Sequence, residues 1–344
     1  MHRILIPSDE HDNVVHMVEG YRSLGCDIVV GKWNLELMSS RFDVVHLQWP
    51  EELTDWNRPT EAQIDHLAAT LDRWSQTTKL ICTVYNLYPH RFQGDERFHR
   101  LYEAVYGRMR MIHHFCPTSR ELVIREYPST ANRNHVVTTP FNYDRLLPDH
   151  RDREAARKEF GIEASDFVVL AFGAIRLWDE AMLLKTAVSS ARVPRMRILM
   201  AARYNEPQSP MRRQWRRWIW KRWLRSSNII PVDRYVPDEE VHKLFDAADV
   251  VVVPRMNSLA SGVPSVAMTF GKLVIAPDFG VMPDFLAGTD NLLYKMGDPD
   301  SLRKAIEKAS TLDLGPIGKN NRKVADGWSW EGITKTLLEQ IDRM

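Results

Sequence analysis

The sequence predicts an α/β protein with two domains, each a parallel β-sheet covered by helices. Its 344 residues exceed one ordinary core and suit two domains of about 150 to 200 residues each. Short apolar runs alternate with helical periodicity in both halves, and this order requires parallel strands joined by right-handed crossovers. A hydrophobic content of 44% with 26% charged residues is typical of a globular protein.

The first half begins directly with a strand. We predict strands at 3–7, 27–30, 42–47 and 79–84 and helices at 13–24 and 62–75, from apolar runs, turn residues and helical spacing. Ligands bind at the carboxyl ends of parallel strands. The segments that follow those ends here are 8–12, 48–52 and 85–91.

The second half repeats the alternation after a polar segment, 140–153, which contains two prolines and no periodicity. We predict that this segment is the interdomain linker. Strands are expected at 167–172, 197–202, 229–231, 250–254 and 273–277, and a final amphipathic helix at 328–344. The predicted domains are 1–145 and 146–326, followed by a C-terminal helix at 327–344.

The stretch 256–280 carries the most functional information. Ser261 and Gly262 precede a predicted amphipathic helix, and a buried strand follows it. A helix start presents unpaired N–H groups and the positive end of a dipole, which suits a diphosphate. Near 172–176 we expect a strand to end in a glycine turn, where Gly173 lets a phosphate approach and Arg176 binds it.

These segments resemble the sugar-nucleotide site of GT-B glycosyltransferases, in particular the family 4 group and its bacterial polysaccharide relatives. Residues 172–176 are similar to the FGxIR of FGxIRPYKG, although Asp179 stands at the lysine position. The segment 46–51, HLQWPE, is similar to HLHWPE, and 83–90, TVYNLYPH, to TLHNLAPHE. Ala260-Ser261-Gly262 resembles the Asn-Ser-Gly of the bacterial exopolysaccharide subgroup that includes the xanthan beta-mannosyltransferase.

The resemblance implies two Rossmann-like domains that face each other across a cleft. The first would bind the acceptor and the second the nucleotide sugar, and the last helix would cross back to the first domain. It implies donor-binding roles for Gly173, Arg176, Arg203, Tyr235, Ser261, Gly262 and Val263. It implies acceptor-binding roles for Glu10, Trp49 and Asn86. The catalytic candidates are Arg176, Glu51, His90, Asp9 and His11.

Sugar transfer needs a positive cradle for the departing diphosphate and, if configuration inverts, a base for the acceptor hydroxyl. The acidic and histidine candidates could serve as that base. If configuration is retained, they would only orient the acceptor. The expected reaction moves a sugar from GDP-mannose or a UDP-sugar to a lipid-linked saccharide in surface polysaccharide synthesis. A sugar-nucleotide epimerase and a catalytically silent GT-B binding protein are the alternatives.

Residues 211–225, MRRQWRRWIWKRWLR, contain seven cations, four tryptophans and no acid. As a helix, this segment suits an anionic membrane surface. The residues expected to contact the membrane are Trp215, Trp218, Trp223, Arg216 and Arg217. Alternatively, the tryptophans pack on the domain and the arginines are solvated.

Charge and cysteine content limit the expected partners, compartment and cofactors. A net charge of +1 gives no general attraction to nucleic acid, which is not an expected partner. The three cysteines lack the paired spacing of a disulfide framework, and no leader is recognised at the N-terminus. We therefore expect a cytoplasmic protein, peripheral on the inner face of the membrane if 211–225 docks there. No metal or other cofactor is expected, and Asp298-Pro-Asp300 is interpreted as a helix cap.

Overall fold

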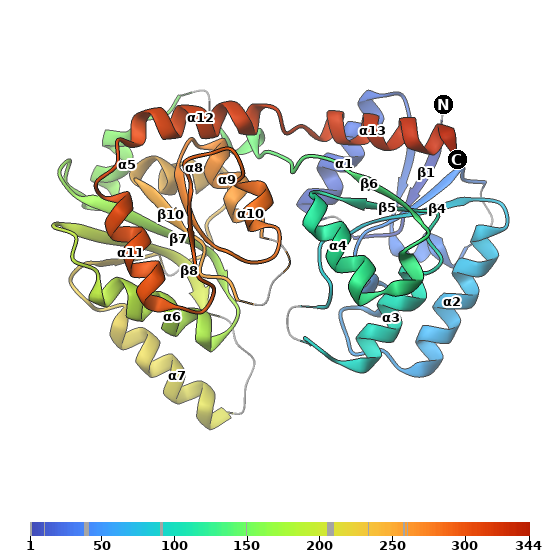
Figure 1. Ribbon diagram of the computed structural model, residues 1–344, viewed down its shortest axis with the longest axis horizontal. Coiled ribbons are helices and arrows are strands. Elements are labelled where there is room, and N and C mark those ends of the chain that lie inside the picture. The colour runs from blue at the N-terminus through green and yellow to red at the C-terminus, as the bar shows by residue number, and fades with distance from the viewer. Residues whose placement is uncertain are drawn as a thin grey trace. The chain divides into compact units, whose positions relative to one another are not determined.

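The computed structural model describes residues 2–9, 11–37, 41–89, 92–148, 150–204, 210–232, 234–256, 259 and 261–344. The side chains of residues 12, 204, 210, 212 and 213 lie outside this description. The chain forms two compact units, Met1–Phe141 with Trp328–Met344, and Asn142–Gly327. Each unit holds a six-stranded parallel sheet flanked by helices (Figure 1). The predicted fold class, α/β with two parallel sheets, is confirmed.

Unit 1 contains a sheet of strand order β2-β1-β3-β4-β5-β6. Its strands are β1 (Arg3–Ile6), β2 (Asp27–Val30), β3 (Val44–Leu47), β4 (Lys79–Thr83), β5 (Met111–His114) and β6 (Asn134–Val137). Its helices are α1 (Asp12–Ser23), η1 (Lys32–Leu35), η2 (Pro50–Thr54), α2 (Glu61–Ser75), α3 (Glu96–Tyr106), α4 (Pro117–Glu126), η3 (Pro128–Thr130) and α13 (Trp330–Arg343). The four predicted strands are present, and the sequence analysis missed β5 and β6.

The C-terminal helix α13 belongs to unit 1 and packs against α1 (Figure 1). The two helices approach closely at Gly20, where a Cβ would lie 2.9 Å from Thr334 Oγ1. Trp330 stacks on Phe141 with ring centroids 4.6 Å apart, and Lys79 Nζ donates to the Ile341 carbonyl at 2.7 Å. Helix α13 is therefore distant in sequence from the rest of unit 1 and completes the core of that unit.

Unit 2 contains a sheet of strand order β12-β11-β10-β7-β8-β9. Its strands are β7 (Phe167–Ile175), β8 (Met196–Tyr204), β9 (Ile229–Pro231), β10 (Val250–Val252), β11 (Leu273–Pro277) and β12 (Leu292–Tyr294). Its helices are η4 (Asp144–Leu146), α5 (Arg153–Glu159), α6 (Trp178–Ser190), α7 (Pro210–Trp223), α8 (Asp238–Ala247), α9 (Val263–Thr269), α10 (Met282–Phe285), α11 (Pro299–Ala309) and α12 (Leu314–Asp326). The strand order reverses between β7 and β10, so the carboxyl ends of these two strands are the expected ligand position.

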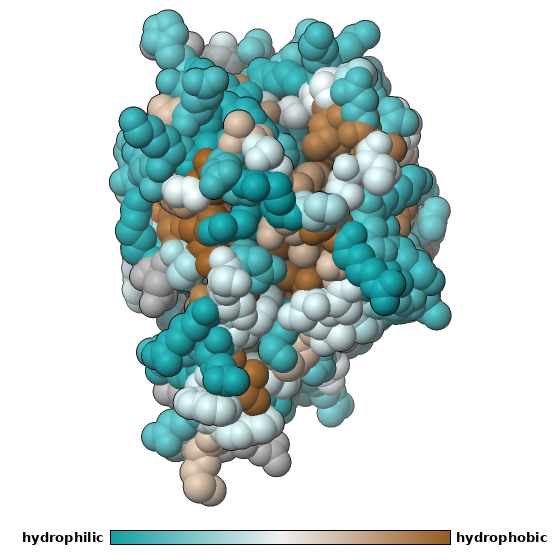
Figure 2. Space-filling model, turned by 90° about the vertical axis from the view of Figure 1, so that its left-hand side faces the viewer, coloured by the Kyte–Doolittle hydropathy of each residue, from teal (hydrophilic) through white to brown (hydrophobic). Residues whose placement is uncertain are grey.

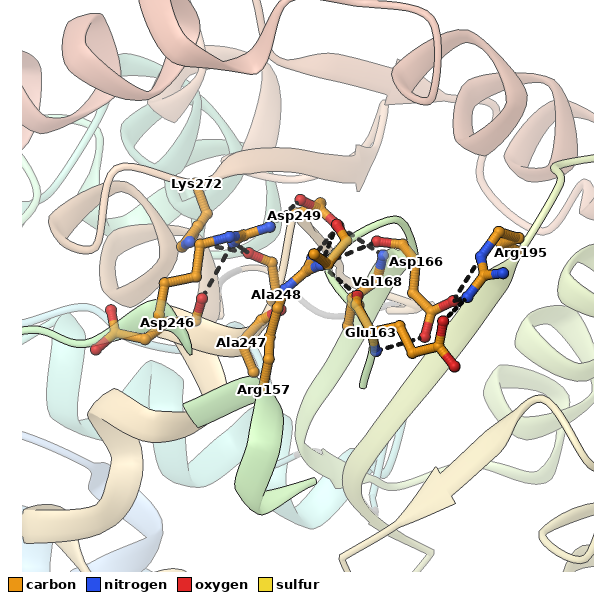
Figure 3. Close-up of polar contacts among 12 residues, drawn as sticks. Arg157, Glu163, Asp166, Val168, Arg195, Asp246, Ala247, Ala248, Asp249 and Lys272 are labelled. Atoms are coloured by element: carbon orange, nitrogen blue, oxygen red, sulfur yellow. Dashed lines mark hydrogen bonds and ion pairs between the residues drawn. The ribbon is translucent and has the colours of Figure 1, made fainter. Parts of the chain in front are cut away.

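A buried polar network holds the opposite, amino ends of the same strands (Figure 3). Arg157 is 5% exposed and pairs with Asp249 at 2.8 Å, and the Asp249 carboxylate accepts the Val168 N–H at 2.7 Å. Lys272 Nζ donates to the Ala248 carbonyl at 2.9 Å, and burial lowers the pKa of Lys272 to about 7. This network is structural and leaves the carboxyl ends of β7 and β10 to a ligand.

Candidate functional site

Gly173 brings the backbone of β7 against the start of α9. A Cβ at Gly173 would lie 3.6 Å from Val263 Cγ2. The two segments that were predicted to form one anion site therefore lie together. The expected glycine turn is wrong, because β7 continues to Ile175 and pairs with β8 through Tyr204. Gly173 remains in the strand with a φ of 90°, a conformation that glycine adopts without strain.

Helix α9 offers fewer backbone donors than its sequence suggested. It has seven residues, all of them buried, so the prediction of an amphipathic helix is wrong. The Val263 N–H donates to Ser261 Oγ at 3.4 Å, and Pro264 has no N–H. Tyr143 lies beside Gly262, where a Cβ would be 2.6 Å from the tyrosine hydroxyl oxygen. An anion at this position therefore needs hydrogen-bond donors from side chains as well as from the backbone.

Glu180 connects the loops that follow β7 and β10. Its buried carboxylate accepts the backbone N–H of Arg176 at 2.8 Å and that of Met256 at 3.2 Å. Arg176 is half-buried, whereas Asp179, at the lysine position of the family motif, is exposed. Buried Glu180 thus has a structural role, because its carboxylate accepts hydrogen bonds from the N–H groups of both loops.

Arg255 is a buried cation that the sequence analysis missed. It is 5% exposed and forms an ion pair with Glu180 at 3.4 Å. Its Nη1 also donates to the Ala174 carbonyl, and its Nη2 lies 3.9 Å from the position that a Gly173 Cβ would occupy. The signal was a single arginine directly after the predicted strand 250–254, a position that is typical of a solvated loop.

Arg203 and Tyr235 lie elsewhere in unit 2. Arg203 pairs with Ala174 along the backbone, but its side chain lines a cavity of about 260 Å³ with Arg217 and Lys221. Its guanidinium lies 5.9 Å from the centre of the exposed Tyr235 ring. These two predicted donor-binding residues contact each other at the β8 side of the sheet, whereas Gly173 lies near Val263.

In unit 1, the segments predicted to follow the strand ends do meet. The buried Glu52 carboxylate accepts the Ser8 hydroxyl at 2.7 Å and the Asp9 N–H at 2.6 Å. His11 Nε2 lies 3.2 Å from the same carboxylate. Glu52 was missed because the resembling motif ends at the preceding residue, Glu51.

Glu51, one of the predicted catalytic residues, is buried. It is 1% exposed, and its carboxylate accepts a hydrogen bond from the Tyr102 hydroxyl. Burial raises the pKa of Glu51 to about 7, although hydrogen bonds from Tyr102 and Asn86 oppose this rise. Asn86 is also buried, at 8% exposed. Both residues therefore organise the interior behind the strand ends.

Trp49 forms the centre of an aromatic group at this edge of unit 1. It stacks on Tyr85 with centroids 4.5 Å apart, and His11 meets it edge-on at 5.1 Å. Asp9 is half-exposed, with its carboxylate 3.6 Å from Lys32 Nζ. Glu10 and His90, which were also predicted at this site, lie outside the described residues.

Comparison with known proteins adds the family of unit 2. Residues 166–311 match the family model described as Glycosyl transferases group 1. This chain is a glycosyltransferase. The matched range contains Gly173, Arg176, Arg255 and the whole of α9, so it covers the candidate anion site. No curated protein sequence is significantly similar to the chain.

Solved structures of low sequence identity share the fold of this glycosyltransferase. Sucrose-phosphate synthase from Thermosynechococcus elongatus has a TM-score of 0.76 at 15% identity, covering 100% of this chain and 99% of that one. HepE from Anabaena, in complex with UDP and glucose, has a TM-score of 0.73 at 12% identity and covers 100% of both chains. The catalytic domain of starch synthase IV from Arabidopsis thaliana, bound to ADP and acarbose, has a TM-score of 0.71 at 11% identity, covering 100% of this chain and 99% of that one. The expected GT-B fold is confirmed.

The cationic helix α7 of the glycosyltransferase has a buried and an exposed face. Trp223 is 5% exposed and contacts the buried Trp220, so its predicted membrane role is wrong. A helix advances about 100° per residue, which turns Trp220 and Trp223 onto the sheet. Trp215 and Trp218 point away from the core and are 62% and 61% exposed.

The arginines of α7 also differ in their surroundings. Arg216 lies over the Trp178 ring at 5.1 Å from its centre, whereas Arg217 is exposed. In Figure 2, the lower end of the view, where α7 lies in Figure 1, combines hydrophilic side chains with pale ones of intermediate hydropathy. No helix within the described residues is long and apolar enough to cross a bilayer. Nor do three or more His, Cys, Asp or Glu side chains gather there as a metal site.

Proposed function

We propose that this glycosyltransferase takes a sugar from a nucleotide diphosphate bound at the carboxyl ends of β7 and β10. The observation that carries the proposal is the approach of Gly173 to Val263 at the point where the strand order reverses, since a Cβ added at Gly173 would lie 3.6 Å from Val263 Cγ2. A glycine there exposes backbone to a phosphate, and Arg176 is the first residue after β7. Cationic side chains would neutralise the leaving diphosphate without a metal ion.

Proteins of similar fold bind nucleoside diphosphates. The HepE structure contains UDP and glucose, and the starch synthase IV structure contains ADP. For this chain we propose GDP-mannose or a UDP-sugar as the donor. Ser261, Gly262 and Val263 would contact the donor together with Gly173 and Arg176, and the exposed Tyr235 and Arg203 would contact it from the β8 side.

We propose that unit 1 binds a saccharide acceptor that is carried on a lipid. Trp49 provides an aromatic surface for a sugar ring, and the adjacent His11 is held by the buried Glu52. His11 and Asp9 are therefore the better candidates for orienting or deprotonating an acceptor hydroxyl, because Glu51 and Asn86 are buried. The motifs around Trp49 support a place near the bacterial exopolysaccharide subgroup, with a role in surface polysaccharide synthesis.

A lipid-linked acceptor requires the protein to reach a membrane surface. Trp215 and Trp218 are exposed on a helix rich in arginine, which suits the headgroup region of an anionic bilayer. We therefore propose that the protein is cytoplasmic and binds the inner face of the cell membrane peripherally through α7.

The test measures nucleotide release and binding separately. First, UDP and GDP are compared by thermal unfolding. The correct nucleotide, at about 100 times its Kd, should stabilise unit 2 by about 2.7 kcal/mol and raise its Tm by roughly 5 to 10 °C. Second, a panel of UDP-sugars and GDP-mannose is incubated with lipid-linked saccharides, and free nucleoside diphosphate is followed.

Release that depends on acceptor supports transfer. Formation of a new sugar from donor and water alone would indicate the epimerase instead. A chain that binds neither UDP nor GDP would contradict the proposed donor site.

A further inference from the structure

The guanidinium of Arg255 occupies an unusual position in unit 2. It is buried directly behind Gly173, and both of its described hydrogen bonds, to the Ala174 carbonyl and the Glu180 carboxylate, come from Nη1. Nε is buried and has no hydrogen-bond partner among the described residues. We propose that Arg255 binds the terminal phosphate of the nucleoside diphosphate, which deepens the proposed function and rests on it.

The charge of Arg255 is incompletely balanced. Its contact with Glu180 is 3.4 Å long, and the same carboxylate also accepts backbone N–H groups from Arg176 and Met256. Burial lowers the pKa of Arg255, although Glu180 opposes this effect. A buried cation with a free N–H is costly unless an anion completes its partners. A phosphate oxygen supplies both the charge and the acceptor.

A phosphate beside Gly173 and the start of α9 needs a cationic side chain to balance its charge. Helix α9 contributes few N–H groups, because Val263 donates to Ser261 and Pro264 has none. The family's lysine position holds Asp179, an exposed acid. Arg255 therefore adds a positive charge on the β10 side of the reversal point, whereas the loop after β7 has Asp179 in place of the family's lysine.

The geometry also indicates which phosphate Arg255 contacts. Nη1 is held from two sides, so the guanidinium is fixed, and Nη2 is the donor nearest to Gly173, 3.9 Å from the position that a Gly173 Cβ would occupy. A planar guanidinium in a fixed position recognises phosphate oxygens with directional hydrogen bonds. The leaving group bears its developing negative charge on the terminal phosphate, and Arg255 would stabilise that charge. A nucleoside monophosphate lacks this group, so it should not benefit from Arg255.

The experiment compares diphosphate and monophosphate binding in matched variants. Affinities for UDP, UMP, GDP and GMP are measured by calorimetry for the wild type, Arg255→Gln and Arg255→Lys. The control is Arg157→Lys, because Arg157 is also an arginine of unit 2 with 5% exposure, and its partners lie at the amino ends of the strands. Thermal unfolding of each variant monitors folding.

We expect Arg255→Gln to weaken binding of the diphosphate about 10- to 100-fold and binding of the monophosphate less than about threefold, since a charge-assisted hydrogen bond is lost. Arg157→Lys should lower the Tm and leave both affinities unchanged. If Arg255→Gln does not fold, Arg255→Lys decides, with an expected loss of at least about fivefold for the diphosphate alone.

Equal effects on both nucleotides, or no effect, would overturn the assignment of Arg255 and leave the donor site intact. A wild type that binds no nucleotide would refute the proposed function together with this inference.

Discussion

Replacing Gly173 with alanine tests the donor site at the backbone itself. Gly173 has a φ of 90°, and an L-residue with positive φ costs at least about 1 to 2 kcal/mol. The added Cβ meets only Val263 Cγ2 at 3.6 Å and Arg255 Nη2 at 3.9 Å, which are ordinary contacts. The variant should therefore fold, with the Tm of unit 2 lowered by roughly 2 to 8 °C.

Nucleotide affinity should fall by more than backbone strain explains. The new methyl group occupies the space between Val263 and Arg255, where we place a phosphate oxygen, and a lost charged hydrogen bond weakens binding roughly tenfold or more. The matched control is Gly161→Ala, because Gly161 has a φ of 64° and a Cβ there meets nothing within 4 Å.

Calorimetry with UDP and GDP and thermal unfolding are performed on both glycine variants. Both should lose similar stability, and only Gly173→Ala should lose affinity. If the two variants bind nucleotide equally well, Gly173 is not a phosphate contact, and the reasoning from the reversal point fails.

Three further predictions concern other parts of the molecule. Changing both Trp215 and Trp218 to alanine should weaken binding to anionic vesicles on the order of tenfold. The control Trp33→Ala, which removes a 74% exposed ring from unit 1, should not weaken it. Equal binding by the wild type and both variants would exclude docking through α7. Glu52→Gln should destabilise unit 1 by about 1 to 3 kcal/mol in denaturant unfolding without changing nucleotide affinity, because the buried Glu52 carboxylate accepts hydrogen bonds from the Ser8 hydroxyl and the Asp9 N–H and lies 3.2 Å from His11 Nε2; unchanged stability would contradict this. The lowered pKa of Lys272 means that the folded state binds fewer protons than the unfolded state above about pH 7, so the free energy of unfolding should rise from pH 7 to 9, and Lys272→Met should abolish that rise.

Local patterns in the sequence predicted nine of the twelve strands that the structure describes. Apolar runs such as 42–47 and 273–277 must be buried as strands, and the segments after parallel strands must meet at one edge. The contacts of Ser8, Asp9 and His11 with one carboxylate confirm that expectation. Asp298 caps α11 as predicted, accepting the N–H groups of Asp300 and Ser301. Strands β5 and β6 were missed because histidine and asparagine interrupt their apolar pattern.

Tertiary contacts decided where each member of two pairs of similar residues lies. The sequence alone favoured Glu51, but η2 turns Glu51 toward Tyr102 and Glu52 toward His11. It likewise grouped Trp223 with the membrane-facing rings, whereas packing of α7 on the sheet buries that ring.

The sequence by itself determined that the chain folds into two parallel α/β sheets, because apolar runs alternate with helical spacing along it. The family resemblance predicted that Gly173 and the 261–263 segment lie near each other, and the approach of Gly173 to Val263 agrees with that prediction. Only the tertiary structure revealed Arg255 behind Gly173, because β10 is separated from β7 in sequence and becomes its neighbour through sheet pairing. The burial and charge balance of Arg255, and the lack of a partner for its Nε among the described residues, result from that pairing, and a linear pattern does not contain them.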